Sequence, residues 1–449
     1  MRPNMHMSTP PRLLRRSFLQ TVSLLLPAVG ATWLRAAAEL PARKPNFIFI
    51  LVDDMSWGDL GCFGHPYAKT PHLDRMAEQG VRFTQFYVAY SVCAPSRSAL
   101  VTGRMPNKAG KRSNESHRLD PALPNIYNLL KPAGYANGHF GKWHLAEGFK
   151  LPADAERLEY KIDEWKLGTA SAKDGLSAQK TTDTALDFIV RHANAPFQVS
   201  IWFFWPHLPV NPNQEQVAVY DDMPEVDISR FHPTMQAKYN QIKKINPAYD
   251  LKENMKGYLA TITEMDKQIG RIQEKLDALK LSENTVLVFS SDNGANATVT
   301  GEKPVEGTST PMWAANAGPY KGGKFSLYEG GIRMSCLVQW KGHIKGGRVS
   351  NFLWRTVDWL PTVCALAGVK TDGLALDGQD VSDVLLGAER ERKEPIFWQG
   401  AVREGKWKLV KNELYDLEAD PSEQNDLAGK EPERAERMQG LLRAWLKKE

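Results

Sequence analysis

Three short segments of the chain are continuously apolar, and each is followed at once by polar residues. They are residues 47–52, 199–204 and 286–289. Continuous apolar runs of this length are typical of strands that are buried on both faces of a sheet. Ligands of open α/β sheets bind beyond the carboxyl ends of the strands. The pattern therefore predicts that one sheet edge carries the residues that follow the runs, namely Asp53, Asp54, Pro206, His207, Ser291, Asp292 and Asn293.

Helical patterns separate the predicted strands. Residues 255–279 place apolar side chains on one face at 3.6-residue spacing, which predicts a long amphipathic helix, and residues 182–190 predict a shorter one. Strands that alternate with helices indicate an α/β layered fold. Residues 208–249 and 294–323 read as long irregular loops, which are more often functional than idle in a compact protein.

The pattern loosens near residues 371–378, and a smaller module follows. Residues 401–410 read as a hairpin that turns at Glu404 and Gly405, and residues 431–448 read as a closing amphipathic helix. We therefore expect a main domain over residues 39–370 and a C-terminal subdomain over residues 371–449.

The first 38 residues have the pattern of a leader. Arg15 and Arg16 precede an apolar run over residues 21–30, and the small residues 36–38 offer a cleavage site. The run is too short to span a bilayer comfortably. We expect a twin-arginine signal peptide over residues 1–38, export of the folded protein through the twin-arginine machinery, and a periplasmic or secreted mature chain without a membrane span.

Composition narrows the class of protein. Hydrophobic residues make up 42% of the chain and charged residues 24%, which is typical of a globular protein rather than a disordered or membrane-embedded one. The formal charge of +5 comes from the leader, which holds five arginines and no acid, so the mature chain is close to neutral. A neutral chain gives no support for nucleic-acid binding. Four cysteines are too few for a disulfide-rich scaffold.

The strand ends carry the side chains that a metal ion would need. Asp53, Asp54, Asp292 and Asn293 offer four oxygen donors, three of them anionic, which suit a hard cation such as Ca²⁺ or Mg²⁺ better than zinc. A solvated turn is the alternative for Asp53 and Asp54 if they stand alone.

The segment from Cys93 to Arg104 is the most specific in the chain. Cys93-Ala94-Pro95-Ser96-Arg97, with Leu100 and Thr102-Gly103-Arg104 behind it, resembles the type I sulfatase signature, C-x-P-S-R with a trailing L-x-T-G-R. Further segments resemble motifs of the same family and follow in the family's order. They are Gly141-Lys142-Trp143-His144, Pro206-His207-Leu208-Pro209, Asp292-Asn293-Gly294, Lys324 with Glu329-Gly330-Gly331-Ile332-Arg333, and Glu413-Leu414-Tyr415-Asp416-Leu417 with Asp420-Pro421.

The resemblance implies a fold, a modification and a metal site. The fold would be alkaline-phosphatase-like, with a large mixed central sheet flanked by helices and a smaller C-terminal α+β subdomain. A maturation enzyme would oxidise Cys93 to formylglycine, whose hydrated aldehyde is the nucleophile. Ca²⁺, in preference to Mg²⁺, would be held by Asp53, Asp54, Asp292, Asn293 and the modified Cys93.

The resemblance also implies catalytic roles. Arg97 would orient the hydrated aldehyde, while Lys142 and Lys324 would bind the sulfate oxygens or the bridging ester oxygen. His207 would protonate the leaving alcohol, and His144 would support the nucleophile and help to break a covalent sulfate intermediate. Preorganised cations supply the electrostatic part of such catalysis, and a positioned acid adds about 10²- to 10⁴-fold. Which histidine takes which proton stays open.

Several functions fit this resemblance. Export of a hydrolase favours an extracellular polymer, so we expect hydrolysis of the O-sulfate groups of a sulfated carbohydrate. An aryl sulfatase, a phosphodiester or phosphonate monoester hydrolase of the same superfamily, and a non-catalytic sulfoglycan-binding homologue are the alternatives. Trp205, Trp313 and Tyr320 are candidates for stacking on a sugar ring, with packing in the core as the alternative.

Overall fold

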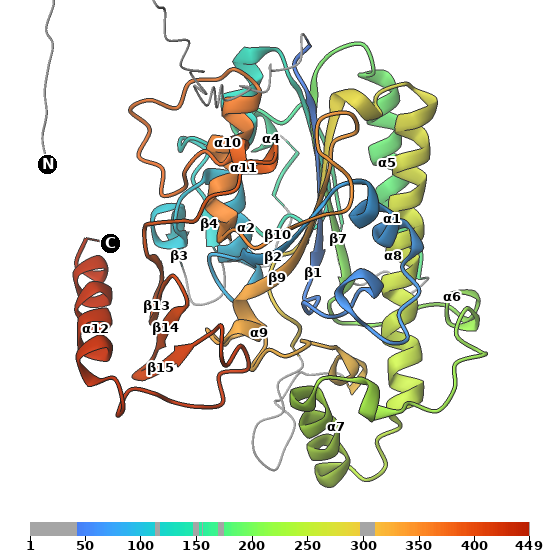
Figure 1. Cartoon of the computed structure of the whole chain (residues 1–449). Helices are drawn as coiled ribbons and strands as arrows, with labels where there is room; N and C mark the ends of the chain where they lie inside the picture. Colours follow the sequence, from blue (N-terminus) through green and yellow to red (C-terminus); the bar gives the residue numbers. More distant parts are fainter. Residues whose placement is uncertain are drawn as a thin grey trace, which may run out of the picture. The chain divides into compact units, whose positions relative to one another are not determined.

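The three apolar runs lie side by side at the centre of a nine-stranded sheet in the computed structural model (Figure 1). The structure describes residues 43–112, 117–146, 152–154, 156–168, 175–296 and 310–448. The runs form β1 (Asn46–Asp53), β7 (Phe197–Pro206) and β8 (Thr285–Ser291), each longer than predicted, and the prediction of three buried strands is confirmed. The predicted leader, residues 1–38, lies outside the described residues.

The sheet is mixed. Its order is β10-β2-β9-β8-β1-β7-β5-β6, and β11 also pairs with β2. β9 runs antiparallel to β2 and β8, and the other pairs are parallel. The remaining strands are β2 (Val81–Tyr87), β5 (Ala136–Gly141), β6 (Glu164–Leu167), β9 (Arg333–Gln339), β10 (Arg348–Ser350) and β11 (Trp354–Arg355).

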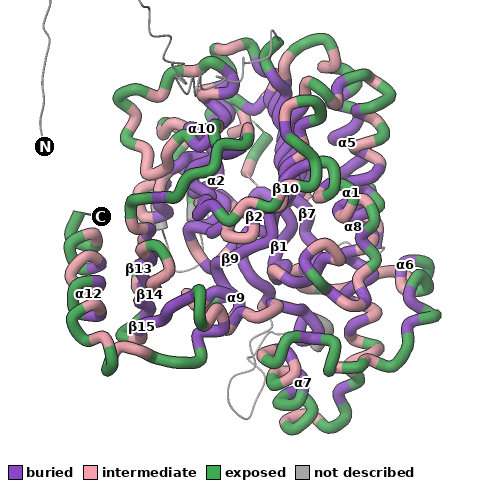
Figure 2. The backbone as a smooth tube through the Cα atoms, viewed as in Figure 1, coloured by how far each residue is buried: buried purple, intermediate pink, exposed green. Residues whose placement is uncertain are grey.

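Helices cover both faces of the sheet (Figures 1 and 2). One face packs against α1 (Pro71–Gln79), α5 (Ser177–Arg191) and α8 (Leu251–Ala278). The other packs against α2 (Cys93–Thr102), α3 (Ile126–Leu130) and α10 (Trp359–Leu366). Successive residues of β1 point to opposite faces, so Phe47 and Phe49 enter one hydrophobic core and Ile48 and Ile50 the other. This two-sided burial explains why the run is continuously apolar.

The long predicted helix is α8, and its start has a local cause. The Asp250 side chain accepts a hydrogen bond from the Glu253 backbone N–H (2.9 Å), which caps the helix four residues before the predicted start. The shorter predicted helix is α5, which begins at Ser177. Both predictions of helix are confirmed.

The prediction of an irregular loop over residues 208–249 is wrong in part. The segment contains α6 (Gln214–Ala218) and α7 (Pro233–Ile245). In α7 only Met235, Tyr239 and Ile242 are buried, and this narrow apolar stripe gave too weak a periodic signal among polar neighbours. Of the other predicted loop, residues 297–309 lie outside the described residues, and Thr310–Ala314 form a 3₁₀ turn.

A small antiparallel sheet stands in the C-terminal part of the chain. Its strands, in the order of the sheet, are β12 (Ile396–Trp398), β13 (Ala401–Glu404), β14 (Trp407–Val410) and β15 (Glu413–Asp416). The hairpin of β13 and β14 turns after Glu404, as predicted. The predicted closing helix is α12 (Pro432–Leu446), which packs on this sheet through Met438 and Leu442. A boundary near residue 370 stays a prediction.

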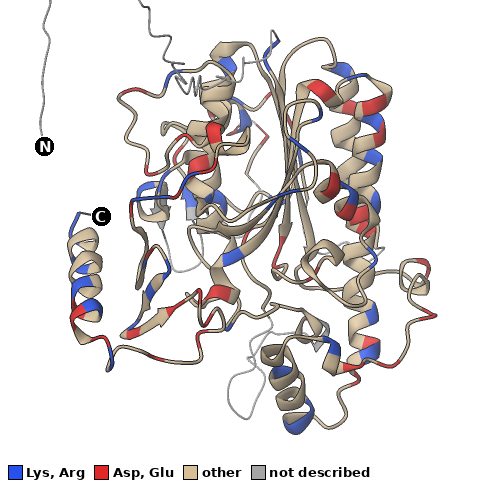
Figure 3. Cartoon of the chain, viewed as in Figure 1, with Lys and Arg blue, Asp and Glu red and all other residues tan. Residues whose placement is uncertain are grey.

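The remaining elements are short. They are β3 (Gly110–Arg112), β4 (His117–Leu119), α4 (Glu156–Glu159), α9 (Glu329–Ile332) and α11 (Ser382–Leu385). Acidic and basic residues both occur along helices such as α8 and α12 (Figure 3). Within the described residues, no helix combines the length and the apolarity that crossing a membrane requires. All four cysteines are free thiols.

Candidate active site

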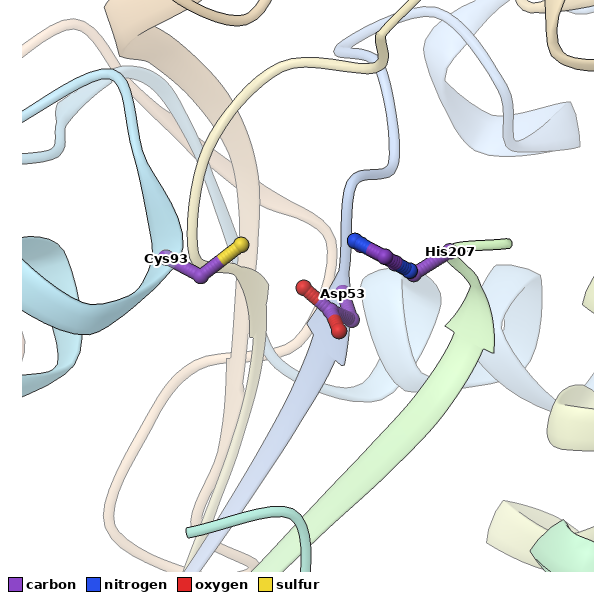
Figure 4. Close-up of side chains that lie close together, drawn as sticks. All are labelled: Asp53, Cys93 and His207. Atoms are coloured by element: carbon purple, nitrogen blue, oxygen red, sulfur yellow. The ribbon is translucent and has the colours of Figure 1, made fainter. Parts of the chain in front are cut away.

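The ends of β1, β7 and β8 deliver polar side chains to one point. Val52 pairs with Ser291 across β1 and β8, and Asp53 pairs with Pro206 across β1 and β7. Asp53, His207 and Asp292 therefore leave the sheet at the same edge, as the strand pattern predicted. Figure 4 shows the side chains of Asp53, Cys93 and His207 facing one another from β1, α2 and the end of β7.

Backbone conformation aims the carboxylates inward. Asp54 has a left-handed backbone (φ 65°), which turns the chain sharply after β1. Its N–H donates to Asp292 Oδ1 (3.2 Å), and the Asp292 N–H donates to the Val52 carbonyl (3.1 Å). The two acidic strand ends are thereby held against each other.

Cys93 is the first residue of α2 and lies buried at this edge. Its Sγ is 3.6 Å from Asp54 Oδ1 and 3.3 Å from Lys324 Nζ. Burial raises the pKa of the Cys93 thiol well above its usual range, and the neighbouring charge of Asp53 adds to the effect. The helix ends at Gly103, whose backbone is left-handed (φ 62°) and whose Cα lies so close to Leu360 that a Cβ would be 2.9 Å from the leucine Cβ.

The oxygen donors fit a divalent cation. Ligand atoms of Asp53, Asp54, Cys93 and Asp292 all lie within 4.8 Å of one another, and all four residues are buried. The Oδ1 atoms of Asp53 and Asn293 are buried and accept no hydrogen bond. Buried carboxylate and amide oxygens without donors are unusual in a protein interior, and they are the ligands that hard cations such as Ca²⁺ prefer.

Three cations surround the carboxylates. Arg97 donates from Nε to Asp292 Oδ2 (2.8 Å), Lys142 pairs with Asp53, and Lys324 Nζ lies 2.7 Å from Asp54 Oδ2. Burial raises the pKa of Asp292 to about 6, although the charge of Arg97 opposes this. Burial alone would also raise the pKa of Asp53, but Lys142 and the other cations hold it well below its usual range. The site therefore contains ionised acids and bases in close contact.

Local backbone geometry places Lys142. Gly141 ends β5 with a left-handed backbone (φ 101°), and a Cβ on it would lie 2.1 Å from the Trp202 carbonyl. Only glycine fits this approach, and it lets the chain turn so that Lys142 leaves the sheet toward Asp53.

The two histidines differ in their surroundings. His207 Nδ1 lies 2.9 Å from the Leu208 carbonyl and donates to it, which leaves Nε2 facing the site, 3.7 Å from Asp54 Oδ2. The His207 side chain is 30% exposed, so it stands at the mouth of the site. His144 is half-buried, and burial together with the charge of Lys142 lowers its pKa to about 3. His144 is therefore neutral in this arrangement.

Sequence reasoning missed two supporting residues. His139 Nε2 donates to the Lys142 carbonyl (3.1 Å), and Trp202 carries the Arg97 guanidinium over its ring at 5.0 Å. A histidine inside the buried strand β5 was the available signal. The candidates for sugar stacking fare differently. Trp205 and Trp313 pack in a hydrophobic core, whereas Tyr320 is 4% exposed at the edge of a groove described below, so none of the three presents an open ring to a sugar.

Sequence comparisons connect the chain with known proteins. A family model described as Sulfatase matches residues 45–369. N-acetylgalactosamine-6-sulfatase of Rattus norvegicus is 31% identical over 424 residues, covering 87% of this chain and 75% of that protein. Arylsulfatase A of Homo sapiens is 30% identical over 453 residues, covering 88% and 85%. N-acetylgalactosamine-6-O-sulfatase of Bacteroides thetaiotaomicron is 27% identical, covering 89% and 93%.

Solved structures show the same architecture. The crystal structure of Ps i-CgsB in complex with k-i-k-neocarrahexaose has a TM-score of 0.72 and 25% identity, covering 90% of this chain and 93% of that one. The phosphonate monoester hydrolase of Agrobacterium radiobacter has a TM-score of 0.65 and 19% identity, covering 90% and 95%. The second likeness concerns the fold alone.

Proposed function

Since this chain belongs to the sulfatase family, has its alkaline-phosphatase-like fold and is a sulfuric ester hydrolase, we propose that it removes O-sulfate groups from a sulfated carbohydrate. One observation carries the proposal: acidic strand ends and the cations Arg97, Lys142 and Lys324 surround Cys93 in a buried site. The names of the N-acetylgalactosamine-6-sulfatases among its relatives support a carbohydrate substrate.

Asp53, Asp54, Asp292 and Asn293 hold a divalent cation in this proposal, together with the modified residue 93. Three carboxylates and an amide oxygen favour Ca²⁺ over a transition metal, and we propose Ca²⁺ in preference to Mg²⁺. Such a cation supplies positive charge to a sulfate oxygen. Conversion of Cys93 to formylglycine would supply an aldehyde that adds water to give two hydroxyls. One hydroxyl would attack sulfur as the substrate alcohol leaves, and deprotonation of the other would re-form the aldehyde and release sulfate.

The chain's own side chains bind and orient the substrate. Lys142 is paired with Asp53 and Lys324 with Asp54, so both ammonium groups lie in the site. In this proposal they donate hydrogen bonds to the sulfate oxygens. Charge-assisted donors of this kind stabilise the charge that builds up as the ester bond breaks. Arg97 is anchored on Asp292, and its NH1 makes no hydrogen bond to the described residues, so it is available to orient the oxygen of residue 93.

Proton transfer falls to the histidines. His207 stands at the mouth of the site with Nε2 inward, where the leaving alcohol departs, and acts as its general acid. His144 follows Lys142 in the same turn and takes the proton when the intermediate breaks down.

Sulfate release from a panel of sulfated saccharides tests the proposal. The protein would carry a Cys93 peptide whose mass shows conversion, and an aryl sulfate and aryl phosphate mono- and diesters would serve as controls. We expect strong release from one saccharide class. If only the aryl sulfate is hydrolysed, the proposal of a carbohydrate substrate is wrong. If no sulfate is released from any substrate while a phosphoester is hydrolysed, the proposed reaction is wrong.

We also propose export by the twin-arginine route to the periplasm or the exterior, from the pattern of residues 1–38. This route carries folded proteins, and Cys93 lies buried in the folded chain, so a maturation enzyme would act before export. Cell fractionation with mass analysis of the Cys93 peptide tests the order of events. Unmodified Cys93 in exported, active protein would contradict it.

A further inference from the structure

A groove of about 1260 Å³ opens beside Lys324. Its described lining comes from α7, from residues 320–328 and from the C-terminal part of the chain at residues 399–425. Lys324 belongs both to this lining and to the site, because its Nζ lies 3.3 Å from Cys93 Sγ. The groove therefore adjoins the candidate active site at Lys324.

Phe325 lines this groove, next to Lys324, and its exposure is abnormal. It is 66% exposed, the highest value of any aromatic side chain in the part of the chain that the structure describes. The backbone of the same residue is fixed, since its N–H donates to the Ser91 carbonyl (3.0 Å) and the Lys324 N–H donates to the Ala295 carbonyl (3.0 Å). The apolar ring is thus presented to solvent from a rigid support beside the site.

The backbone of Phe325 is strained as well. Its φ of 68° lies in the left-handed region, which is unfavourable for a bulky side chain and almost free of cost for glycine. Seven described residues other than glycine have such a backbone, and five of them belong to the site or adjoin the groove: Asp54, His144, Phe325, Lys411 and Glu423. Strain of this kind clusters at ligand-binding positions. The exposed Phe325 ring has a cation–π contact with Lys324, whose Nζ lies 5.7 Å from the ring centroid, and otherwise faces solvent, so packing offsets little of this strain.

The groove is also basic. Its described lining includes Lys238, Lys321, Lys324 and Lys411 but a single acid, Asp420. Burial lowers the pKa of Lys238 to about 7, and Lys324 is paired with Asp54, so Lys321 and Lys411 remain as the basic side chains that a ligand could meet. Lys411 is exposed, and Lys321 lies over the Tyr328 ring at 4.1 Å. A neutral sugar would gain nothing from this wall, whereas an anionic one would.

We propose that the groove is a saccharide subsite for an oligosaccharide that carries a second anionic group, with Phe325 stacking on a sugar ring and Lys411 and Lys321 facing the added charge. This inference rests on the proposed function and specifies its substrate class. The apolar face of a pyranose ring packs on an aromatic face, and a sulfate or carboxylate on a neighbouring position is attracted by the lysines that line the same groove.

Variants of Phe325 separate binding from folding. Phe325→Gly is expected to lower kcat/KM on a doubly charged sulfated disaccharide about tenfold, mainly through KM, as expected when part of an aromatic contact is lost. Its melting temperature is expected not to fall, since relief of the strained backbone offsets the freedom that glycine adds to the unfolded chain. Phe325→Trp is expected to keep most of the saccharide activity. Val349→Ala, which shortens an exposed side chain of β10 outside the groove, is the matched control.

Lys411→Asn tests the second charge, because asparagine tolerates the left-handed backbone of Lys411 (φ 57°). We expect about a threefold to fivefold rise in KM for the doubly charged disaccharide at low salt, shrinking in high salt, and less than half that effect on the singly sulfated analogue. Equal effects on both disaccharides would overturn the anionic subsite.

The outcomes distinguish the subsite from the reaction. If Phe325→Gly has the KM of the wild type, or if its melting temperature falls by several degrees, the ring serves packing and does not stack on a sugar. Sulfate release by the wild-type protein in those same assays would leave the proposed function standing. Absence of release from every saccharide and from an aryl sulfate by matured wild-type protein would instead overturn both.

Discussion

Replacing Lys408 by methionine tests how the C-terminal sheet is attached to the sheet that carries the site. Lys408 lies on β14 and is fully buried, with its Nζ 2.8 Å from Glu329 Oε1 and 2.8 Å from Glu423 Oε1. Glu329 also pairs with Arg333 (3.2 Å), and its backbone N–H donates to Glu423 Oε2 (2.6 Å). Methionine keeps the volume of the lysine stem and removes only its charge.

The expected cost follows from the two carboxylates that stay behind. Breaking a buried ion pair by removing one partner costs about 3–5 kcal/mol, and here Glu423 loses its cation whereas Glu329 keeps Arg333. A compact unit of roughly 400 residues unfolds with an entropy of about 0.8 kcal/mol per kelvin. Lys408→Met is therefore expected to lower the melting temperature by about 4–6 °C.

A double variant isolates the charge. Burial raises the pKa of Glu423 to about 7, so its neutral form is readily reached. Adding Glu423→Gln to Lys408→Met keeps an acceptor for the Glu329 N–H and removes the carboxylate that lost its cation. Calorimetry should show at least half of the lost stability restored. A double variant that melts below Lys408→Met, or a single variant within 1 °C of wild type, would refute the role assigned to charge compensation.

Three further predictions concern the site and the core. Chelation of divalent cations is expected to abolish sulfate release, because the positive charge that the cation would supply to a sulfate oxygen is then lost, and Ca²⁺ should restore the activity at a lower concentration than Mg²⁺. His207→Asn should lower kcat on a saccharide sulfate about 10²- to 10⁴-fold, and less on an aryl sulfate with a good leaving group; equal losses would contradict its role as general acid. Burial lowers the pKa of His65 to about 3, so the unfolded chain binds the proton more tightly and stability falls as pH drops below 6.5, by about 1.4 kcal/mol per pH unit. His65→Asn keeps an acceptor for the N–H groups of Tyr67 and Ala68 and should flatten that slope in denaturation at pH 5 to 7; identical slopes would argue against the assignment.

The central strands and the strand-end acids could be predicted because their signals are local. A strand buried on both faces needs a continuous apolar run, and parallel neighbours end at the same edge, which brings Asp53 and Asp292 together. The helix α7 could not be predicted, since three buried side chains among polar ones give little periodicity.

Contacts between distant segments were beyond the reach of a single sequence. The pairing of Lys408 with Glu329 joins residues 79 positions apart. In the sequence alone, this lysine and this glutamate look like any charged residues on the surface. Phe325 escaped notice for a related reason, because an exposed phenylalanine looks like a core residue until its surroundings are known. The tryptophans beside the predicted strands attracted the sugar-stacking prediction and proved to be core.

In these proposals, catalysis and substrate selection depend on two different parts of the fold. The ends of the large sheet and α2 hold the groups that act on the sulfate ester, whereas residues 399–425 contribute one wall of the proposed saccharide subsite. The Lys408 cluster connects the two, since Glu329 follows Lys324 by five residues and the Glu423 carbonyl accepts from Lys321 Nζ (3.2 Å). A loosened cluster would therefore shift the groove wall before it disturbed the carboxylates at the sheet edge. Substrate selection can change through the C-terminal part while the chemistry of sulfate-ester cleavage stays the same.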